Sequence, residues 1–328
     1  IAEIYESRLG SLPVYFIAGD PITESASVYS SNPSLDGEKY TFFSLAALEM
    51  LNHLDWEPDI LHANDWHTGL AAYALQLKRW DGELHQTKSV LTVHNLPFMG
   101  PDVTGQLAAY GQALAQTDLP DWAHTLPLPL GMWASQKIVA VSPTYAKEML
   151  TPELGAGLEN FLTIHEESLT GIINGIDIRS FDPETDPEIA TNYSAETLQE
   201  RASNKAALQK LMGLKIDEKI PLFGVVSRLE NQKGVDLVLN ALAKLNNIPW
   251  QAFILGTGDP LLEKKARRLE KRMPERVKVE IRYDGKLARK IYAGSDIFLM
   301  PSRYEPCGLS QMIAMRYGSV PIVRNTGG

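Results

Sequence analysis

Residues 297–310 read IFLMPSRYEPCGLS. The apolar run at its start, ended by Pro301, is typical of a buried strand, and Gly308 followed by an apolar segment is typical of a helix start. Ligands of open α/β sheets bind outside the carboxyl ends of the strands, and the free N–H groups of a helix start can hold a phosphate. This stretch therefore predicts a strand over 297–301, a phosphate-binding helix start at Gly308 and a carboxylate, Glu305, beside the phosphate.

Short apolar runs alternate with longer segments of helical period along the rest of the chain. In the second half the predicted strands are 221–227, 251–255, 277–282, 297–301 and 320–324. In the first half they are 13–18, 59–63, 89–93, 137–141 and 171–173, with helices predicted over 41–54 and 67–79. Strands that alternate with helices indicate an α/β fold with mostly parallel sheets.

The chain of 328 residues is longer than one typical domain. The segment 177–193 is rich in Pro, Asp, Glu and Thr, and its prolines interrupt regular structure, so it is the predicted linker. We expect two doubly wound, Rossmann-like domains that face each other across a cleft. The predicted N-terminal domain comprises residues 1–173 and the predicted C-terminal domain residues 174–328.

Residues 227–234 read SRLENQKG and follow another predicted strand. Arg228 stands at the strand end, and Lys233 stands at the start of the next helix. Two cations at the strand ends where a phosphate is bound would neutralise a diphosphate and stabilise its departure as a leaving group. The alternative is that both are ordinary surface charges.

The composition excludes several classes of partner. With 31 Lys and Arg against 40 Asp and Glu, the net charge of −9 gives no electrostatic reason to expect nucleic acid binding. No stretch approaches the roughly 18 uninterrupted apolar residues that a membrane helix needs. The single cysteine, Cys307, cannot form an intramolecular disulfide, which favours a reducing compartment.

Four further motifs accompany the two stretches above. They are HANDWHTGL (62–70), TVHN (92–95), INGID (173–177) and RNTGG (324–328). In this order, over essentially the whole chain, the sequence resembles the bacterial glycogen synthase and plant starch synthase family. The resemblance implies the two-domain GT-B architecture and a glucosyltransferase that keeps the α configuration of the donor glucose.

The resemblance also implies roles for the matching residues. Arg228 and Lys233 would hold the donor diphosphate, and Glu305 would lie near the transferred glucose. Asp65, His94 and Asn95 would contact the sugar from the other domain. Tyr283 would flank the base, and the remaining donor contacts would be Gly308, Leu309, Ser310, Thr326 and Gly327. We favour a front-face route in which Glu305 orients the sugar and forms no covalent intermediate.

Each of these residues also has a structural interpretation. Glu305 could be a solvated carboxylate at a helix start, His94 a hydrogen-bonded core histidine, and Asp65 the N-cap of the helix that follows it. Cys307 is expected to serve packing. Residues 256–258, Gly-Thr-Gly, are expected to form a tight turn because they lack the remaining features of a dinucleotide fingerprint.

Two other patterns in the sequence do not predict a functional site. The histidines and Asp65 of the first half lack the spacing of a helical zinc motif, so no metal site is predicted. The basic run over 264–272 is expected to be a solvated helix face.

The predicted reaction is transfer of glucose from ADP-glucose to the non-reducing end of an α-1,4-glucan, with no cofactor. UDP-glucose stays open as the donor. The alternatives are a non-catalytic glucan-binding scaffold or another GT-B enzyme, such as a sucrose-forming transferase or a sugar-nucleotide epimerase. The expected location is the cytoplasm of a bacterium, or the plastid stroma or starch granule of a plant or alga. The absence of an initiating Met and of the family's terminal segments predicts a central fragment.

Overall fold

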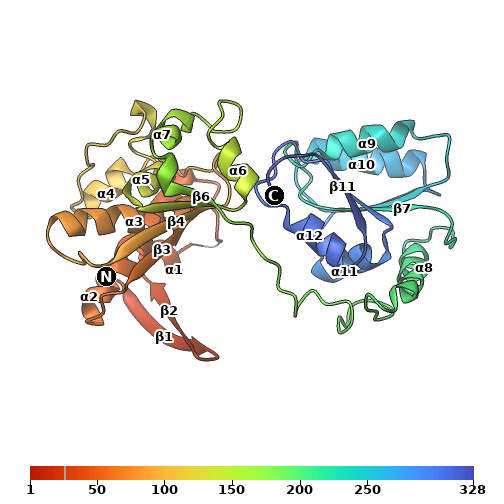
Figure 1. Ribbon diagram of the computed structural model, residues 1–328, viewed down its shortest axis with the longest axis horizontal. Helices are drawn as coiled ribbons and strands as arrows, with labels where there is room; N and C mark the ends of the chain where they lie inside the picture. The colour runs from red at the N-terminus through yellow and green to blue at the C-terminus, as the bar shows by residue number, and fades with distance from the viewer. Residues whose placement is uncertain (26) are drawn as a thin grey trace. The chain divides into compact units, whose positions relative to one another are not determined.

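The computed structural model describes residues 1–25 and 27–328. The chain divides into two compact units, residues 1–173 and residues 174–328. Each unit is built on its own parallel sheet (Figure 1).

The sheet of the second unit has five parallel strands, in the order β11-β10-β7-β8-β9. The strands are β7 (Leu222–Val226), β8 (Gln251–Leu255), β9 (Val277–Glu280), β10 (Ile297–Met300) and β11 (Val320–Val323). Their predicted bounds are confirmed to within two residues. The order reverses between β7 and β10, which pair with each other at Ile297 and Phe223. Ligands of doubly wound sheets bind at such a reversal, outside the carboxyl ends of the strands.

Helices cover both faces of this sheet. Side chains of neighbouring residues on a strand point to opposite faces, so Phe223 packs with α9 (Val235–Lys244) and α10 (Pro260–Arg272), whereas Leu222 packs with α8 (Arg201–Leu211) and α11 (Gly285–Gly294). Beside β10, α12 (Leu309–Arg316) joins the second face. Figure 1 shows α9 and α10 on one side of the sheet and α11 and α12 on the other.

The sheet of the first unit has four parallel strands in the order β3-β4-β5-β6. They are β3 (Ile60–Asn64), β4 (Lys88–Val93), β5 (Lys137–Ala140) and β6 (Leu169–Gly171). The helices of this unit are α1 (Asp20–Thr23), α2 (Pro33–His53), α3 (Asp65–Trp80), α4 (Thr104–Ala109), α5 (Pro127–Ala134), α6 (Pro143–Glu148) and α7 (Glu159–Ile164). Short 3-10 helices comprise Asp121–Ala123, Glu166–Ser168 and, in the second unit, Leu198–Glu200.

Glycines allow α3 and α5 to touch. A Cβ placed on Gly131 of α5 would lie 2.6 Å from the Cα of Gly69 in α3, which is too close for any side chain. The two helices therefore pack backbone to backbone, and this contact fixes the direction in which α3 leaves β3.

The expectation for residues 13–18 is wrong in its pairing. They form β2 (Leu12–Ala18), which pairs antiparallel with the unpredicted strand β1 (Glu3–Leu9) in a separate two-stranded sheet. Gly10, with φ 64°, lies in the two-residue connection, where a tight hairpin needs positive φ. The sequence signal for this hairpin was therefore the glycine between the two segments.

The predicted linker, 177–193, is part of the second unit and is packed against the rest of it. Its Tyr193 is 4% exposed and donates a hydrogen bond from its hydroxyl to the carbonyl of Tyr317 at 2.8 Å. Ile189 is buried in the cluster that includes Phe298 of β10. The prolines prevent regular structure here, as predicted, but buried side chains hold the segment in place.

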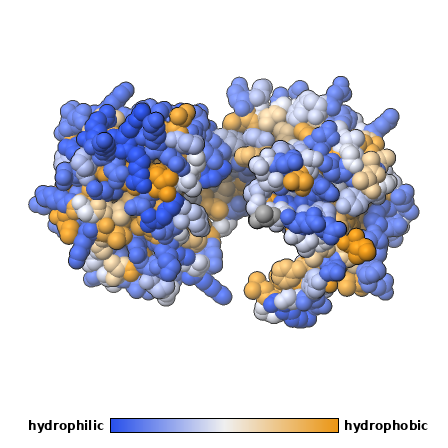
Figure 2. Space-filling model, turned by 180° about the vertical axis from the view of Figure 1, so that it is seen from behind, coloured by the Kyte–Doolittle hydropathy of each residue, from blue (hydrophilic) through white to orange (hydrophobic). Residues whose placement is uncertain are grey.

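The surface of the molecule is mixed. Figure 2 shows one face, on which hydrophilic residues predominate and hydrophobic residues occur in separate patches. The helix α10 buries Leu262, Ala266 and Leu269 and exposes the basic residues between them, so the expectation of a solvated basic face is confirmed. Among the described residues, no helix has the length and apolar character needed to cross a bilayer.

Candidate active site

A buried ion pair lies at the strand-order reversal of the second unit. Lys233 follows β7, and its Nζ donates to Oε2 of Glu305, which follows β10, at 2.7 Å. The hydroxyl of Ser302 donates to the same oxygen at 2.8 Å. Glu305 is only 8% exposed, so it is not a solvated helix-start carboxylate. The structure brings together two of the predicted site residues, from loops that are 72 residues apart.

The loops after β7 and β10 interlock through their backbones. The N–H of Arg303 donates to the carbonyl of Gln232 at 2.8 Å, and the side-chain amide of Gln232 donates to the carbonyl of Tyr304 at 3.1 Å. Gly234, with φ 66°, lies so close to Pro301 that a Cβ would meet its carbonyl oxygen at 2.2 Å. Lys233 and Glu305 are therefore held by backbone contacts on either side of their own ion pair.

A second ion pair joins the same two loops. Arg303 donates to both carboxylate oxygens of Asp236, in the first turn of α9, at 2.7 and 2.8 Å. These hydrogen bonds hold the pKa of the Asp236 carboxyl below its usual value, and raise the pKa of Arg303. A bidentate guanidinium–carboxylate pair has a defined geometry, so it fixes the direction in which the loop leaves β10.

Replacement of Asp236 by asparagine should therefore cost stability in a pH-dependent way. A carboxyl whose pKa is lower in the folded protein stabilises it above the unfolded pKa, and this contribution is lost as the pH falls through the folded pKa. The free energy of unfolding of D236N should be lower than that of the unsubstituted protein at about pH 7, and the gap should close toward about pH 3. Urea unfolding at a series of pH values measures this gap. An equal gap at every pH would contradict the role given to the carboxylate.

The predicted helix start at Gly308 is present. Gly308 has φ 84° and is the N-cap of α12, so Leu309 and Ser310 form the first turn. No side-chain cap hydrogen bond is made to this turn. An uncapped helix start followed by backbone N–H groups is suited to an anion, which the helix dipole also favours.

The last residues of the chain lie against the backbone that carries Glu305. A Cβ on Gly327 would come within 1.6 Å of the carbonyl oxygen of Glu305, and one on Gly328 within 1.9 Å of that of Cys307. Thr326 is 9% exposed. Gly327 thus lies against the backbone of Glu305, and the close approach explains why glycine is needed at positions 327 and 328.

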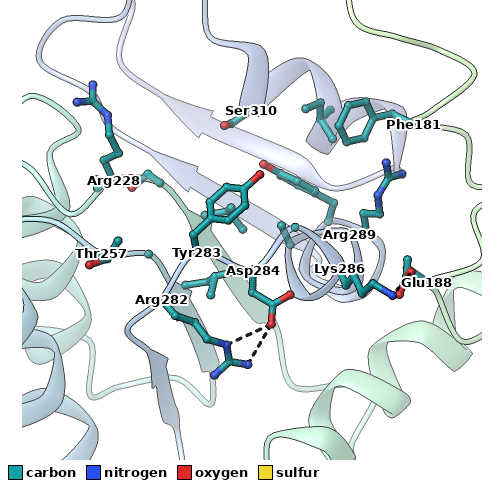
Figure 3. Close-up of a pocket in the computed structure, with 18 residues that line it drawn as sticks. Phe181, Glu188, Arg228, Thr257, Arg282, Tyr283, Asp284, Lys286, Arg289 and Ser310 are labelled. Carbon is teal, nitrogen blue, oxygen red and sulfur yellow. Dashed lines mark hydrogen bonds and ion pairs between the residues drawn. The ribbon is translucent and has the colours of Figure 1, made fainter. Parts of the chain in front are cut away.

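A pocket of about 570 Å³ opens at the carboxyl ends of β7, β8 and β9 (Figure 3). Three predicted donor contacts line it: Arg228, Tyr283 and Ser310. Tyr283 is 91% exposed, and in Figure 3 its ring stands in the middle of the pocket view. Arg228 is paired with Glu230 at 2.9 Å and half exposed, so its guanidinium is accessible to a ligand.

The wall of this pocket at β8 corrects one expectation. Residues 256–258 form no turn: Gly258 makes a parallel bridge with Leu229, and Gly256 lies against the carbonyl oxygen of Ser227, where a Cβ would come within 1.9 Å. The two glycines therefore serve a close approach of two strand ends.

In the first unit, Asp65 and His94 are directly connected. The backbone N–H of His94 donates to Oδ1 of Asp65 at 2.7 Å, and a 3.0 Å hydrogen bond joins His94 Nε2 to Oδ1 of Asn64. Asp65 has φ 53°, a conformation that non-glycine residues adopt rarely and that clusters at functional sites. His94 is half-buried and not a core residue.

The structure also corrects the capping interpretation of Asp65. Asn64 is the N-cap of α3, without a side-chain cap hydrogen bond, and the carboxylate of Asp65 is directed to His94 instead. Next to His94, the buried Oδ1 of Asn95 has no hydrogen-bond partner within the described part of the chain. An unpaired buried carbonyl is costly, so Asn95 is suited to accept a hydrogen bond from a ligand hydroxyl.

Sequence reasoning missed Ser302 and Asn64 as site residues. Ser302 lies within the stretch 297–310, and Asn64 lies directly before Asp65. In both cases the available signal was a polar residue within one or two positions of a strand's carboxyl end. A local sequence pattern does not give the direction in which the side chains of Ser302 and Asn64 point, and this direction decides whether they belong to the site.

The expectation that Cys307 serves packing fits the structure. Cys307 is buried, and burial raises the pKa of its thiol, which is the opposite of what a nucleophile requires. No group of three His, Cys, Asp or Glu side chains placed to bind a metal occurs among residues 1–25 and 27–328.

Known proteins resemble this chain in both units. Residues 1–164 match the family model described as the starch synthase catalytic domain, and residues 211–328 match that of glycosyl transferases group 1. The glycogen synthase of Thermotoga maritima is 41% identical over 339 aligned residues, which cover 99% of this chain and 68% of the relative. The chain belongs to the glycogen and starch synthase family.

Other members support this assignment. The glycogen synthase of Streptococcus mutans is 42% identical over 298 residues, 89% of this chain and 63% of that protein. The chain thus spans 63 to 68% of the length of these two relatives. Among solved structures, the catalytic domain of starch synthase IV from Arabidopsis thaliana, bound to ADP and acarbose, has a TM-score of 0.88 and 33% identity. The match covers all of this chain and 69% of that one. The predicted family and the predicted class of two Rossmann-like α/β units are confirmed.

Proposed function

We propose that the protein elongates α-1,4-glucans, transferring glucose from a sugar nucleotide to the non-reducing end with retention of configuration. The observation that carries this proposal is the Lys233–Glu305 ion pair at the strand-order reversal of the second unit, beside a pocket for the nucleotide. Family membership supports the same reaction. ADP-glucose is the proposed donor, because the related starch synthase IV was solved with ADP; UDP-glucose is the alternative.

The donor is proposed to lie along the carboxyl ends of the strands of the second unit. Its base would occupy the pocket beside Tyr283, and its diphosphate would lie between Arg228, Lys233 and the first turn of α12 at Gly308. Two cations and a helix start would then stabilise the negative charge that develops on the departing diphosphate.

Glu305 is proposed to orient the transferred glucose. Its Oε2 already accepts hydrogen bonds from Lys233 and Ser302, so this oxygen is fixed in place and is not presented as a nucleophile. A fixed carboxylate suits the front-face route, in which the departing phosphate itself takes the proton of the incoming hydroxyl. Retention then needs no covalent intermediate.

Asp65, His94 and Asn95 stay predicted sugar contacts of the first unit. Their polar atoms have the chemistry that a hexose needs, since a hexose presents hydroxyl groups that both donate and accept. The unpaired Oδ1 of Asn95 is the strongest support for this role. The reaction is proposed to need no cofactor or metal, with a glucan and a nucleotide sugar as partners and a cytoplasmic or plastid location.

Incorporation of label from radioactive ADP-glucose or UDP-glucose into precipitable glycogen tests the proposal. The assay contains chelator, so it also tests the metal-free reaction. Lys233→Ala is the site variant, and Lys265→Ala, in the exposed face of α10, is the matched control. Incorporation that is lost only in K233A is the expected result. No incorporation from either donor would contradict the proposed function and favour a glucan-binding scaffold or another transfer reaction.

A further inference from the structure

The pocket at the carboxyl ends of β7 to β9 has one wall that belongs to neither the sheet nor a helix. Phe181 and Glu188 line the pocket, and both lie in the segment 177–193 that was predicted to be a linker. Figure 3 shows Phe181 above Arg289 and Glu188 beside Lys286, on the side of the pocket formed by α11. This segment has no regular secondary structure, so its position must come from side-chain contacts.

Arg289 of α11 makes several of these contacts. Its guanidinium lies 4.5 Å from the ring centroid of Phe181, a cation–π distance. It also donates to the backbone carbonyl and, at 3.0 Å, to the hydroxyl of Ser180. Arg289 lines the pocket itself, so its position affects any ligand there directly.

Asp186 forms hydrogen bonds to both parts of this wall, although it does not line the pocket. Its Oδ2 accepts from Arg289 at 3.1 Å and from the hydroxyl of Tyr317. Its Oδ1 accepts from the N–H of Glu188 at 2.9 Å, and Glu188 is paired with Lys286 at 3.0 Å. The Asp186 side chain is 0% exposed, so the carboxylate is fully withdrawn from water.

We propose that Asp186 is a positioning residue of the nucleotide pocket, which acts through Arg289 and the backbone of Glu188 to hold the 177–193 wall in the shape that the donor nucleotide needs. This inference rests on the proposed function, because it takes the nucleotide to be the ligand. Asp186 neutralises the guanidinium of Arg289, which lines the pocket. Removal of the carboxylate charge should therefore change the position of Arg289 in the pocket. The guanidinium is then left without its charge partner, and it gains by turning toward water in the pocket.

The replacement Asp186→Asn keeps the shape of the side chain and removes its charge. Titration calorimetry with ADP should show an affinity about tenfold weaker in D186N than in the unsubstituted protein. In the transfer assay the same variant should raise the donor KM, while kcat and the glucan KM stay within about twofold. A residue that serves stability alone would not separate the donor KM from the other constants at a temperature where the variant is folded.

A double-mutant cycle tests whether Asp186 acts through Arg289. R289M and the double variant D186N/R289M should bind ADP equally weakly, since the second change removes nothing further. Asp182→Asn is the matched control: Asp182 lies in the same segment and pairs with Arg316 at 3.1 Å, and neither residue lines the pocket. D182N should bind ADP as the unsubstituted protein does. Equal weakening in D182N, or additive losses in the double variant, would overturn the assignment to Asp186.

Tyr317→Phe provides a second variant if D186N does not fold. It removes the hydroxyl that donates to Asp186 and accepts from Arg289 at 3.2 Å, and Tyr317 does not line the pocket. Y317F should weaken ADP binding about threefold. Unchanged ADP affinity in every folded variant overturns this inference and leaves the proposed function intact. No binding of ADP or UDP to the unsubstituted protein overturns both.

Discussion

Glu305→Gln is expected to reduce glucan synthesis by about a hundredfold to a thousandfold, mainly in kcat. Glutamine has the same shape as glutamate but no charge. The ammonium of Lys233, which is 2.7 Å from the carboxylate and little exposed, then loses its partner and its fixed position. The loss of rate is expected mainly in the transition state, because the negative charge that Lys233 is proposed to neutralise on the diphosphate is greatest there.

Initial rates at saturating donor and glucan measure this effect. The matched control is Glu270→Gln, which removes another ion-paired carboxylate of the second unit, 3.0 Å from Arg267 on α10 and remote from the pocket. Its rate should equal that of the unsubstituted protein. Ser302→Ala, which removes one hydrogen bond and keeps the charge, should lose about tenfold. If E305Q kept more than about a tenth of the rate, the role proposed for Glu305 would be wrong.

Gly234→Ala should lower both stability and activity. The backbone at position 234 has φ 66°, where an L residue is strained by about 1 to 2 kcal/mol. The new Cβ would also lie 2.2 Å from the carbonyl oxygen of Pro301, which belongs to backbone and cannot rotate away. The loop after β7 must therefore separate from the loop after β10, and Lys233 moves with it. We expect a loss of about 3 kcal/mol or more in the free energy of unfolding, and a loss of most activity.

Gly213→Ala separates the effect of backbone strain from that of the contact with Pro301. Gly213 has φ 63°, almost the same backbone strain, but a Cβ there would meet nothing within 4 Å. G213A should lose about 1 kcal/mol in the free energy of unfolding and keep full activity. Chemical denaturation of both variants measures the difference. Equal losses would show that the contact with Pro301 contributes nothing to the site.

The sequence was most informative where a strand is buried on both faces. The apolar runs of β7, β8 and β10 predicted these strands well, because a parallel strand between two helical layers has no polar face. The residues after them could be assigned to one edge of the sheet by the same rule, which is how Lys233 and Glu305 were chosen. Their direct contact depends on the strand order, in which β10 pairs with β7, and on Gly234 and Pro301 meeting; neither follows from local pattern.

Sequence reasoning failed where side-chain contacts replace regular structure. Residues 177–193 have the composition of a linker, and nothing local shows that Asp186 is buried against Arg289, 103 residues later. The strand β1 and its antiparallel pairing with β2 were missed for a different reason. Its side chains are mostly exposed, so the apolar alternation that marks a half-buried strand is weak.

Cys307 provides a reporter for the opening of the site. It is the single thiol of the chain, it is 6% exposed, and it lies between Glu305 and the helix start at Gly308. Modification by a thiol reagent requires a thiolate that the reagent can reach, so the folded site should react slowly, through transient local opening. The labelling rate thus measures how often the loop after β10 separates from its neighbours. A donor nucleotide that binds the closed loop should slow the labelling in proportion to its occupancy.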